Sequence, residues 1–112
     1  MRADDFRRIA LSLPDTEESS HHGHPDFRVR GKIFATLAHP SRGWGMVALT
    51  PTHQTRVCRA EPEVFFPVNG AWGRGGATHV YLRLARLRSV RAALKSAWTN
   101  RAMKARRRRT SS

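Results

Sequence analysis

Apolar residues near the start of the chain recur with the period of an α-helix. Four of them follow the i, i+3, i+4, i+7 spacing of a single helix face: Phe6, Ile9, Ala10 and Leu13. Asp4 and Asp5 fall in the first turn, where negative charge suits the helix dipole. Because proline cannot continue a helix, we predict that this one ends at Pro14.

A change to alternating apolar and polar positions predicts strands after this helix. The segment DFRVRGKIFATL, residues 26–37, reads as a hairpin with its turn at Gly31. Arg28 and Arg30 occupy polar positions of the alternation, and Lys32 lies close to the turn. A turn-rich segment, residues 39–43, then leads to a third predicted strand, residues 44–50.

The second half combines two helical segments with a further strand. Thr50 and Pro51 suit a helix N-cap and first helical position, so we predict a helix that stops before Pro62. EVFF, residues 63–66, is predicted as a short apolar turn, NGAWGRGGA as a glycine-dense loop, and THVYLRL, residues 78–84, as a strand. The last helix begins near Leu87, with apolar positions at Val90, Leu94, Ala97 and Trp98.

This order of elements predicts an α+β fold in one small domain. We expect a mostly antiparallel sheet with helices packed on one face, over residues 1–100. Residues 101–112 are predicted to be a disordered basic tail, because adjacent arginines repel one another and bury nothing.

The chain's length and composition exclude several classes of protein. With 112 residues it suits a single domain, and no apolar run approaches the roughly 20 residues of a membrane helix, so we expect no membrane insertion. Its N-terminus lacks the apolar core of a signal peptide. A lone cysteine, Cys58, allows no internal disulfide and fits a reducing compartment, so we expect a cytoplasmic protein.

Charge is the most unusual global feature, and it is unevenly distributed. The net charge is +13; residues 1–63 hold nine basic and eight acidic residues, whereas residues 64–112 hold twelve basic and no acidic residues. A charge distribution this uneven favours a polyanionic partner. Nucleic acid is the first candidate and an anionic membrane the second. A solubilising tail on an ordinary domain is the alternative explanation.

The segment HHGHPDF, residues 21–27, places three histidines within four positions. His21 and His24 could converge with Asp26 on a metal ion, but no second ligand group with an established spacing follows. We therefore expect no metal and no cofactor, and imidazoles that fix a turn marked by Gly23 and Pro25.

The glycine-dense segment AWGRGGAT, residues 71–78, has two possible interpretations. Glycines around Arg74 could let backbone amides approach an anion, although the segment matches no phosphate-loop pattern. It could equally be a tight turn with Trp72 packed beneath it. Because no nucleophile system or catalytic carboxylate pair is visible elsewhere, we expect a protein that is not an enzyme.

Four segments together resemble the MmcQ/YjbR family. They are LSLP, S-H-x-G-H-P-D-F-R-V-x-G-K-I-F-A, W-G-M-V-x-L-T-P and W-G-x-x-G-A-T, and the similarity covers roughly residues 3–100. The resemblance implies a small CyaY-like α+β fold of double-wing type and DNA binding, with no catalytic residue or cofactor to carry over. This chain departs from the family in the basic character of its last helix, where relatives usually carry acidic residues.

Two functions follow as hypotheses, with a monomer favoured for both. The first is a non-enzymatic DNA-binding protein of unknown sequence specificity, which contacts phosphates through Arg28, Arg30, Lys32, Arg74, Arg88, Arg91 and Lys95. The alternative is a domain that binds a small molecule or anion between the His21–Asp26 turn and the Trp72–Gly76 loop, through His21, His24, Asp26, Trp72 and Arg74. A frataxin-like iron binder ranks below both because the acidic ridge it would need is missing.

Overall fold

The computed structural model describes the backbone of residues 1–110 and the side chains of residues 1–105. Its α-helices are α1 (Ala3–Ser12), α2 (Pro51–Ala60), α3 (Gly70–Arg74) and α4 (Leu87–Thr110), with a 3₁₀ turn at Leu82–Leu84. Its strands are β1 (Thr16–His21), β2 (His24–Val29), β3 (Lys32–Leu37), β4 (Trp44–Ala48), β5 (Phe65–Pro67) and β6 (Ala77–Tyr81).

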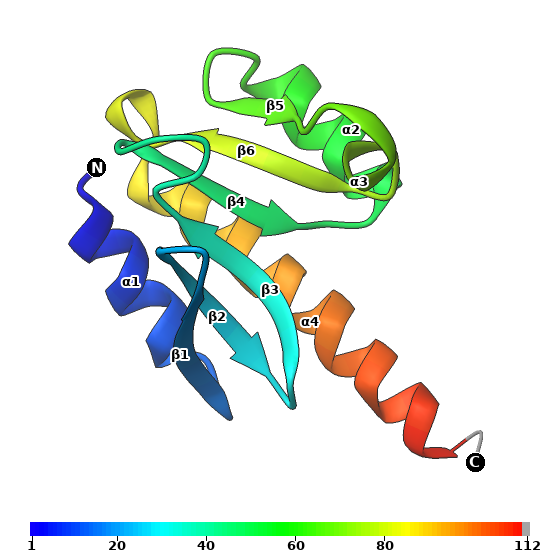
Figure 1. Cartoon of the computed structure of the whole chain (residues 1–112). Helices are drawn as coiled ribbons and strands as arrows, with labels where there is room; N and C mark the ends of the chain where they lie inside the picture. Colours follow the sequence, from blue (N-terminus) through cyan, green and yellow to red (C-terminus); the bar gives the residue numbers. More distant parts are fainter. Residues whose placement is uncertain (111–112) are drawn as a thin grey trace.

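The strands form one six-stranded sheet in the order β1-β2-β3-β4-β6-β5, and every neighbouring pair is antiparallel (Figure 1). The first four strands follow one another as a meander. β6 then pairs with β4, and β5 takes the edge beside β6. The predicted α+β fold with a mostly antiparallel sheet is confirmed.

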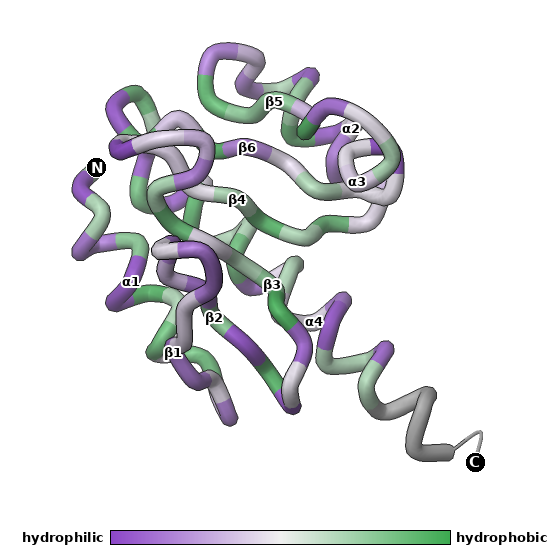
Figure 2. The backbone as a smooth tube through the Cα atoms, viewed as in Figure 1, coloured by the Kyte–Doolittle hydropathy of each residue, from purple (hydrophilic) through white to green (hydrophobic). Residues whose placement is uncertain are grey.

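The main hydrophobic core lies between one face of this sheet and the helices α1 and α4. Figure 1 shows α4 crossing behind the central strands, and Figure 2 shows apolar stretches along them. α2 packs on the same side, since Val57 and Cys58 contact this core. The largest fully buried side chains include Phe6 of α1, Phe27 of β2, Phe34 of β3 and Leu94 of α4. Burial of such side chains is the main force that holds the two layers together.

The opposite face, which we call the outer face, carries a row of mostly polar residues. Cross-strand pairing places Asp26, Thr36, Met46 and His79 side by side on β2, β3, β4 and β6. Asp26 and Thr36 are buried although they point away from the main core. The short helix α3 covers part of this face.

The predicted cap of α2 is present. The Thr50 hydroxyl accepts a hydrogen bond from the His53 backbone N–H at 3.2 Å, and Pro51 is the first helical residue. Gln54 is buried in the middle of the helix, where its Nε2 donates to the carbonyls of Gly73 and Ala77 at 2.8 and 2.9 Å. These bonds attach α2 to the start of β6 and to α3.

Four segments differ from the elements expected. Residues 16–21 form strand β1, which the polar sequence TEESSH did not indicate, because an edge strand needs no apolar face. Residues 65–67 are a strand rather than a turn, and residues 70–74 are a helix rather than a loop. The expected strand at residues 78–84 ends at Tyr81, and a 3₁₀ turn follows it at Leu82–Leu84, where Leu84 is exposed.

The last helix also extends further than the boundary placed at residue 100. α4 continues to Thr110, and Ala102 and Ala105 are buried. Small apolar residues at these positions keep one face of the helix against the rest of the domain, so residues 101–105 belong to the fold. Residues 111–112 of the predicted tail lie outside the described residues. No helix among the described residues is long and apolar enough to span a membrane.

Candidate functional site

The histidine-rich segment forms the end of the β1–β2 hairpin. His21 and His24 are paired residues on the two strands, and His22 with Gly23 makes the turn between them. Both turn residues have positive φ, 50° at His22 and 78° at Gly23. Only His21 and His24 therefore lie on the sheet, while His22 is exposed.

Asp26 is fully buried and holds two neighbours. Its carboxylate accepts hydrogen bonds from Nε and an Nη of Arg28 at 2.9 and 3.2 Å, and it lies 2.7 Å from Nδ1 of His21. The bonds from Arg28 hold the pKa of the Asp26 carboxyl below its ordinary value, against the opposing effect of burial, and His21 adds to the lowering. The same bond raises the pKa of Arg28.

The aromatic rings of three residues gather around His39. The ring of His39, in the connection between β3 and β4, lies with its centroid 5.2 Å from that of His24, 6.5 Å from that of Trp72 and 6.2 Å from that of His79. Burial, with a smaller contribution from His39, lowers the pKa of His79. The neutral form of His79 is therefore favoured.

Two adjoining cavities lie beside these rings. A small cavity of about 40 Å³ is lined by His21, His24, Thr36, His39 and Trp72. A larger one of about 330 Å³ shares His21, Thr36 and Trp72 with it and adds Lys32 and Arg101 among its walls. The fold thus brings together His21, His24 and Trp72, which the sequence placed in one hypothetical pocket.

The other two residues of the hypothetical pocket, Asp26 and Arg74, lie outside both cavities. Asp26 does not line either cavity but holds His21 from the side. Arg74 ends α3, is exposed and lines neither cavity.

Two glycines fix the position of α3, and therefore of Trp72. A Cβ at Gly73 would lie 1.4 Å from the carbonyl oxygen of Val68, and a Cβ at Gly76 would lie 1.9 Å from that of Leu49. Gly76 also has a φ of 115°, a conformation that side chains disfavour. The W-G-x-x-G pattern is thus a packing requirement that seats α3 against neighbouring backbone.

The basic residues chosen from the sequence do not share one surface. On the hairpin, Arg28 is bound to Asp26, an Nη of Arg30 lies 4.0 Å from a carboxylate oxygen of Asp15, and Lys32 lines the larger cavity. The other group, Arg88, Arg91 and Lys95, is exposed on α4. The sheet separates these three residues from the outer face, on which Asp26 and Arg28 lie.

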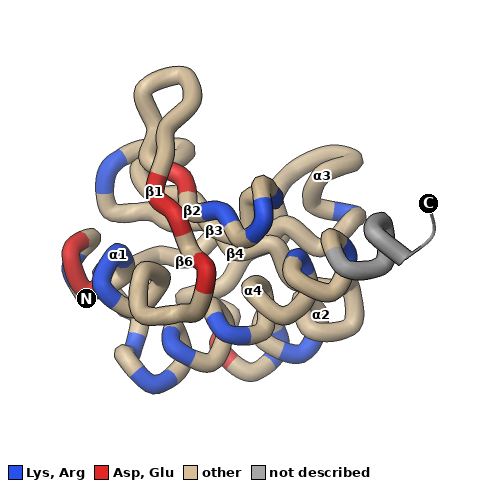
Figure 3. Tube along the Cα trace, turned by 90° about the horizontal axis from the view of Figure 1, so that it is seen from below, with Lys and Arg blue, Asp and Glu red and all other residues tan. Residues whose placement is uncertain are grey.

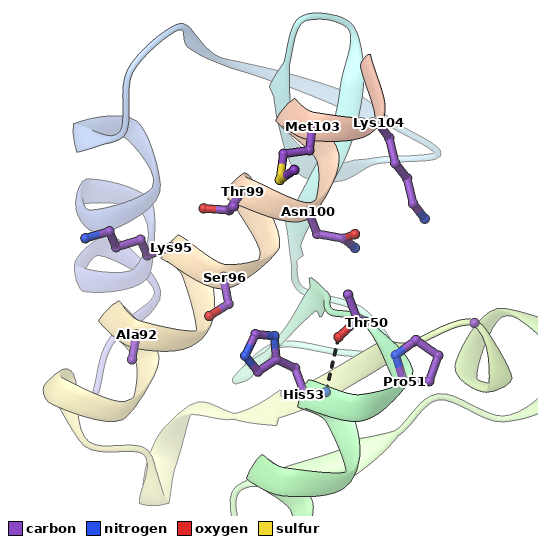
Figure 4. Close-up of a pocket in the computed structure, with 11 residues that line it drawn as sticks. Thr50, Pro51, His53, Ala92, Lys95, Ser96, Thr99, Asn100, Met103 and Lys104 are labelled. Carbon is purple, nitrogen blue, oxygen red and sulfur yellow. Dashed lines mark hydrogen bonds between the residues drawn. The ribbon is translucent and has the colours of Figure 1, made fainter. Parts of the chain in front are cut away.

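A second hollow lies between α2 and α4, on the helical side of the molecule. A groove of about 690 Å³ runs along the two helices (Figure 4), and an adjoining hollow of about 410 Å³ shares His53, Ala92 and Ser96 with it. Lys95 lines the first part, and Arg56 and Arg88 line the second. The first part has no acidic residue in its walls.

Sequence reasoning missed several residues of these hollows. Thr36 pairs with Asp26 of β2, but its own sequence neighbours do not mark it as part of a pocket. His39 and Arg101 line the cavities, and His79 lies beside His39. None of the three carried a local signal, because the pairing of distant strands and the length of α4 bring them there. Among residues 1–105, no three His, Cys, Asp or Glu side chains are arranged to hold a metal ion.

Comparison with known proteins gives the chain's family. The family model described as YjbR matches residues 11–100. The chain belongs to the YjbR family. No curated protein matches this YjbR-family chain.

A solved structure shares the YjbR-family fold. It is the crystal structure of Deinococcus radiodurans protein DR2400, described by the family domain DUF419, with a TM-score of 0.73 and 15% sequence identity. The match covers 87% of the present chain and 75% of that protein. At this identity the likeness concerns the fold alone.

Proposed function

We propose that this YjbR-family chain binds DNA, mainly through the phosphate backbone, by the exposed helical side of the domain. We call the surface concerned the basic helical face; it consists of five exposed side chains on α2 and α4: Arg56, Arg59, Arg88, Arg91 and Lys95. The hairpin residues Arg28 and Lys32 are not part of it.

The observation that carries this proposal is the absence of ion pairs among the cations of that face, although Glu61 lines the hollow that Arg56 and Arg88 share. Within the described part of the chain, none of the five side chains forms an ion pair. Most acidic positions lie on β1 and near the N-terminus, and two, Glu61 and Glu63, follow α2, while α2 and α4 themselves carry basic ones (Figure 3). Uncompensated cations on one side of a molecule attract a polyanion and orient it.

The groove between α2 and α4 supports the same function through the groups that line it. It is lined by Lys95 and by hydroxyl and amide side chains, among them Thr99 and Asn100 (Figure 4). The N-terminus of α2 borders it at Thr50 and Pro51, and helix N-termini favour anions. Donors of this kind contact phosphates without reading base sequence, so we expect weak sequence preference.

A salt titration tests the proposal. Each phosphate contact contributes about −0.9 to the slope of log affinity against log salt, so five contacts give a slope of about −4.5. We expect such a slope for binding of a fluorescent 20-base-pair duplex, measured by anisotropy. A flat salt response, or no binding at low salt, would contradict the proposal.

Two variants of equal charge locate the surface. R88Q/R91Q removes two cations from the basic helical face, and R8Q/R42Q removes two exposed cations from α1 and the β3–β4 connection. We expect the first variant to weaken binding and to make the slope shallower by about 1.8. The control should keep most of the affinity, and equal losses in both would show attraction by net charge alone.

A chain that ends at Ala105 separates the folded face from the arginine run that follows it. The proposal expects this shortened chain to bind with a shallower slope that still responds to R88Q/R91Q. Complete loss of binding on shortening would assign the activity to residues 106–112 and not to the basic helical face.

A further inference from the structure

The two cavities on the outer face form a second site that is separate from the basic helical face. We call them together the Trp72 pocket. β3 and β4 pair only from Ala35 to Leu37, and beyond this stretch the strands diverge (Figure 1). Lys32 and Ala48 line the opening, Trp72 of α3 lies at one side of it, and Arg101 of α4 reaches it from the other.

The pocket contains buried polar atoms that have no partner within the described residues. Thr36 is only 2% exposed, lines both cavities, and its hydroxyl makes no hydrogen bond there. Nδ1 of His24 and Nε of Arg101 are buried and unpaired in the same way. Since nearly all buried polar groups in folded proteins have partners, three unpaired ones around a single hollow indicate a place for a polar ligand.

The charge of the pocket selects the sign of that ligand. Lys32 and Arg101 line the larger cavity, and no acidic residue lines either one. The nearest carboxylate in the hairpin, Asp26, is bound by Arg28 and His21. Arg101 makes no ion pair within the described residues, and a guanidinium is suited to bind the oxygens of a phosphate or carboxylate in pairs.

The wall and the size of the pocket indicate the size of the ligand and the presence of an apolar part in it. Trp72 is 45% exposed, so its indole offers an apolar surface at the mouth. A volume of about 330 Å³ suits a small organic molecule rather than a polymer. The inner cavity of about 40 Å³ has room for little more than a polar group of a few atoms.

We propose that the Trp72 pocket binds a small organic anion, whose phosphate or carboxylate contacts Arg101, Lys32 and the Thr36 hydroxyl and whose planar part lies against Trp72. The proposal does not depend on DNA binding, because none of these residues belongs to the basic helical face. It also assigns a role to Thr36 and Arg101 that their packing does not explain.

Titration by nuclear magnetic resonance tests the proposal on the full chain. Phenyl phosphate and benzoate are the two anionic probes, inorganic phosphate tests the anion without a ring, and benzyl alcohol tests the ring without the charge. We expect saturable shifts of the Trp72 indole N–H and the Arg101 Nε–H with the ring-bearing anions, weaker shifts with inorganic phosphate, and none with benzyl alcohol. A preference between phenyl phosphate and benzoate identifies the anionic group.

Three variants show whether the shifts report this site. Arg101→Gln removes the guanidinium, and we expect its affinity for the better anionic probe to fall at least about tenfold, since bonds to charged groups are strong. Thr36→Val keeps the shape and removes only the unpaired hydroxyl, so the protein should stay folded while affinity falls about threefold to tenfold. The control Arg42→Gln, in the β3–β4 connection, should bind the probe as the unaltered protein does.

Two results would overturn the proposal. One is the absence of saturable shifts at Trp72 and Arg101 with any of the anions at millimolar concentration, or equal shifts with benzyl alcohol. The other is unchanged affinity in both Arg101→Gln and Thr36→Val when thermal unfolding shows that they are folded.

Discussion

Nδ1 of His21, on β1, lies 2.7 Å from Oδ2 of Asp26, on the paired strand β2. This contact gives the HHGHPDF segment its structural role, because a buried carboxylate fixes the imidazole at the rim of the Trp72 pocket. Arg28 holds the same carboxylate from its other side. Of the three histidines in the segment, His21 and His24 line the pocket and His22 forms the turn.

Asp26→Asn should destabilise the protein at neutral pH by about 2 kcal/mol, because it removes a charged acceptor from Arg28 and His21 in a buried position. Urea unfolding at pH 7 measures the change. The matched control is Asp15→Asn, whose exposed carboxylate lies 4.0 Å from Arg30 and should contribute less than about 0.5 kcal/mol.

The contribution of Asp26 to the free energy of unfolding should also decrease as the pH is lowered. Its pKa in the folded protein lies below the ordinary 3.8, so its stabilising effect is complete above that value and is lost as the pH falls through the lower folded-state pKa. As the pH falls below about 4, the unaltered protein should lose stability that Asp26→Asn has already lost. Parallel curves for the two proteins would rule out this linkage.

The glycines of the W-G-x-x-G segment should differ sharply in their tolerance of alanine. At Gly73 a Cβ would overlap the Val68 carbonyl oxygen at 1.4 Å, whereas at Gly75 the nearest atom would lie at 3.4 Å. Gly73→Ala should therefore cost about 3 kcal/mol or prevent folding, and Gly75→Ala should change stability by less than about 1 kcal/mol. Thermal unfolding of the two variants side by side decides the point, and similar losses would argue against the close approach.

Gln54→Leu should destabilise the domain although it replaces a polar residue by an apolar one in a buried position. The amide donates to the carbonyls of Gly73 and Ala77, and leucine would leave both of them without this donor. We expect a loss of about 1 to 3 kcal/mol in denaturant unfolding. Thr55→Ala, which removes an exposed bond to the Pro51 carbonyl one residue along the same helix, should cost less than about 1 kcal/mol.

Much of this fold could be predicted from local sequence, because the elements that face the main core have clear periods. The helix after Thr50, the hairpin around Gly31 and the helix from Leu87 lie where alternation and capping placed them. Strand β1 could not be found in this way, since an exposed edge strand such as TEESSH has no apolar face. α3 was hidden because its glycines indicate a loop, whereas the structure uses Gly73 for close packing.

The candidate sites were harder to predict for a different physical reason. His24 and Trp72 were brought into one hypothesis because both stand in unusual segments, and they do line one cavity. Thr36 and Arg101, which supply two of the three unpaired groups of that pocket, look ordinary in sequence. Their role arises from where β3 and β4 diverge and from how far α4 extends, and neither property can be read from neighbouring residues.

His79 should make the protein less stable as the pH falls below neutrality. Burial and the nearby His39 lower its pKa from the ordinary 6.5, so the unfolded chain takes up a proton before the folded protein does. Stability is therefore complete above about pH 6.5 and decreases below it, until the pH reaches the folded-state pKa. In His79→Phe the aromatic contact with Trp44 can persist while the titrating group is gone, so its unfolding free energy should fall less between pH 7 and pH 5. Urea unfolding of both proteins at several pH values across that range measures the difference, and an identical pH dependence would show that the imidazole of His79 is not responsible.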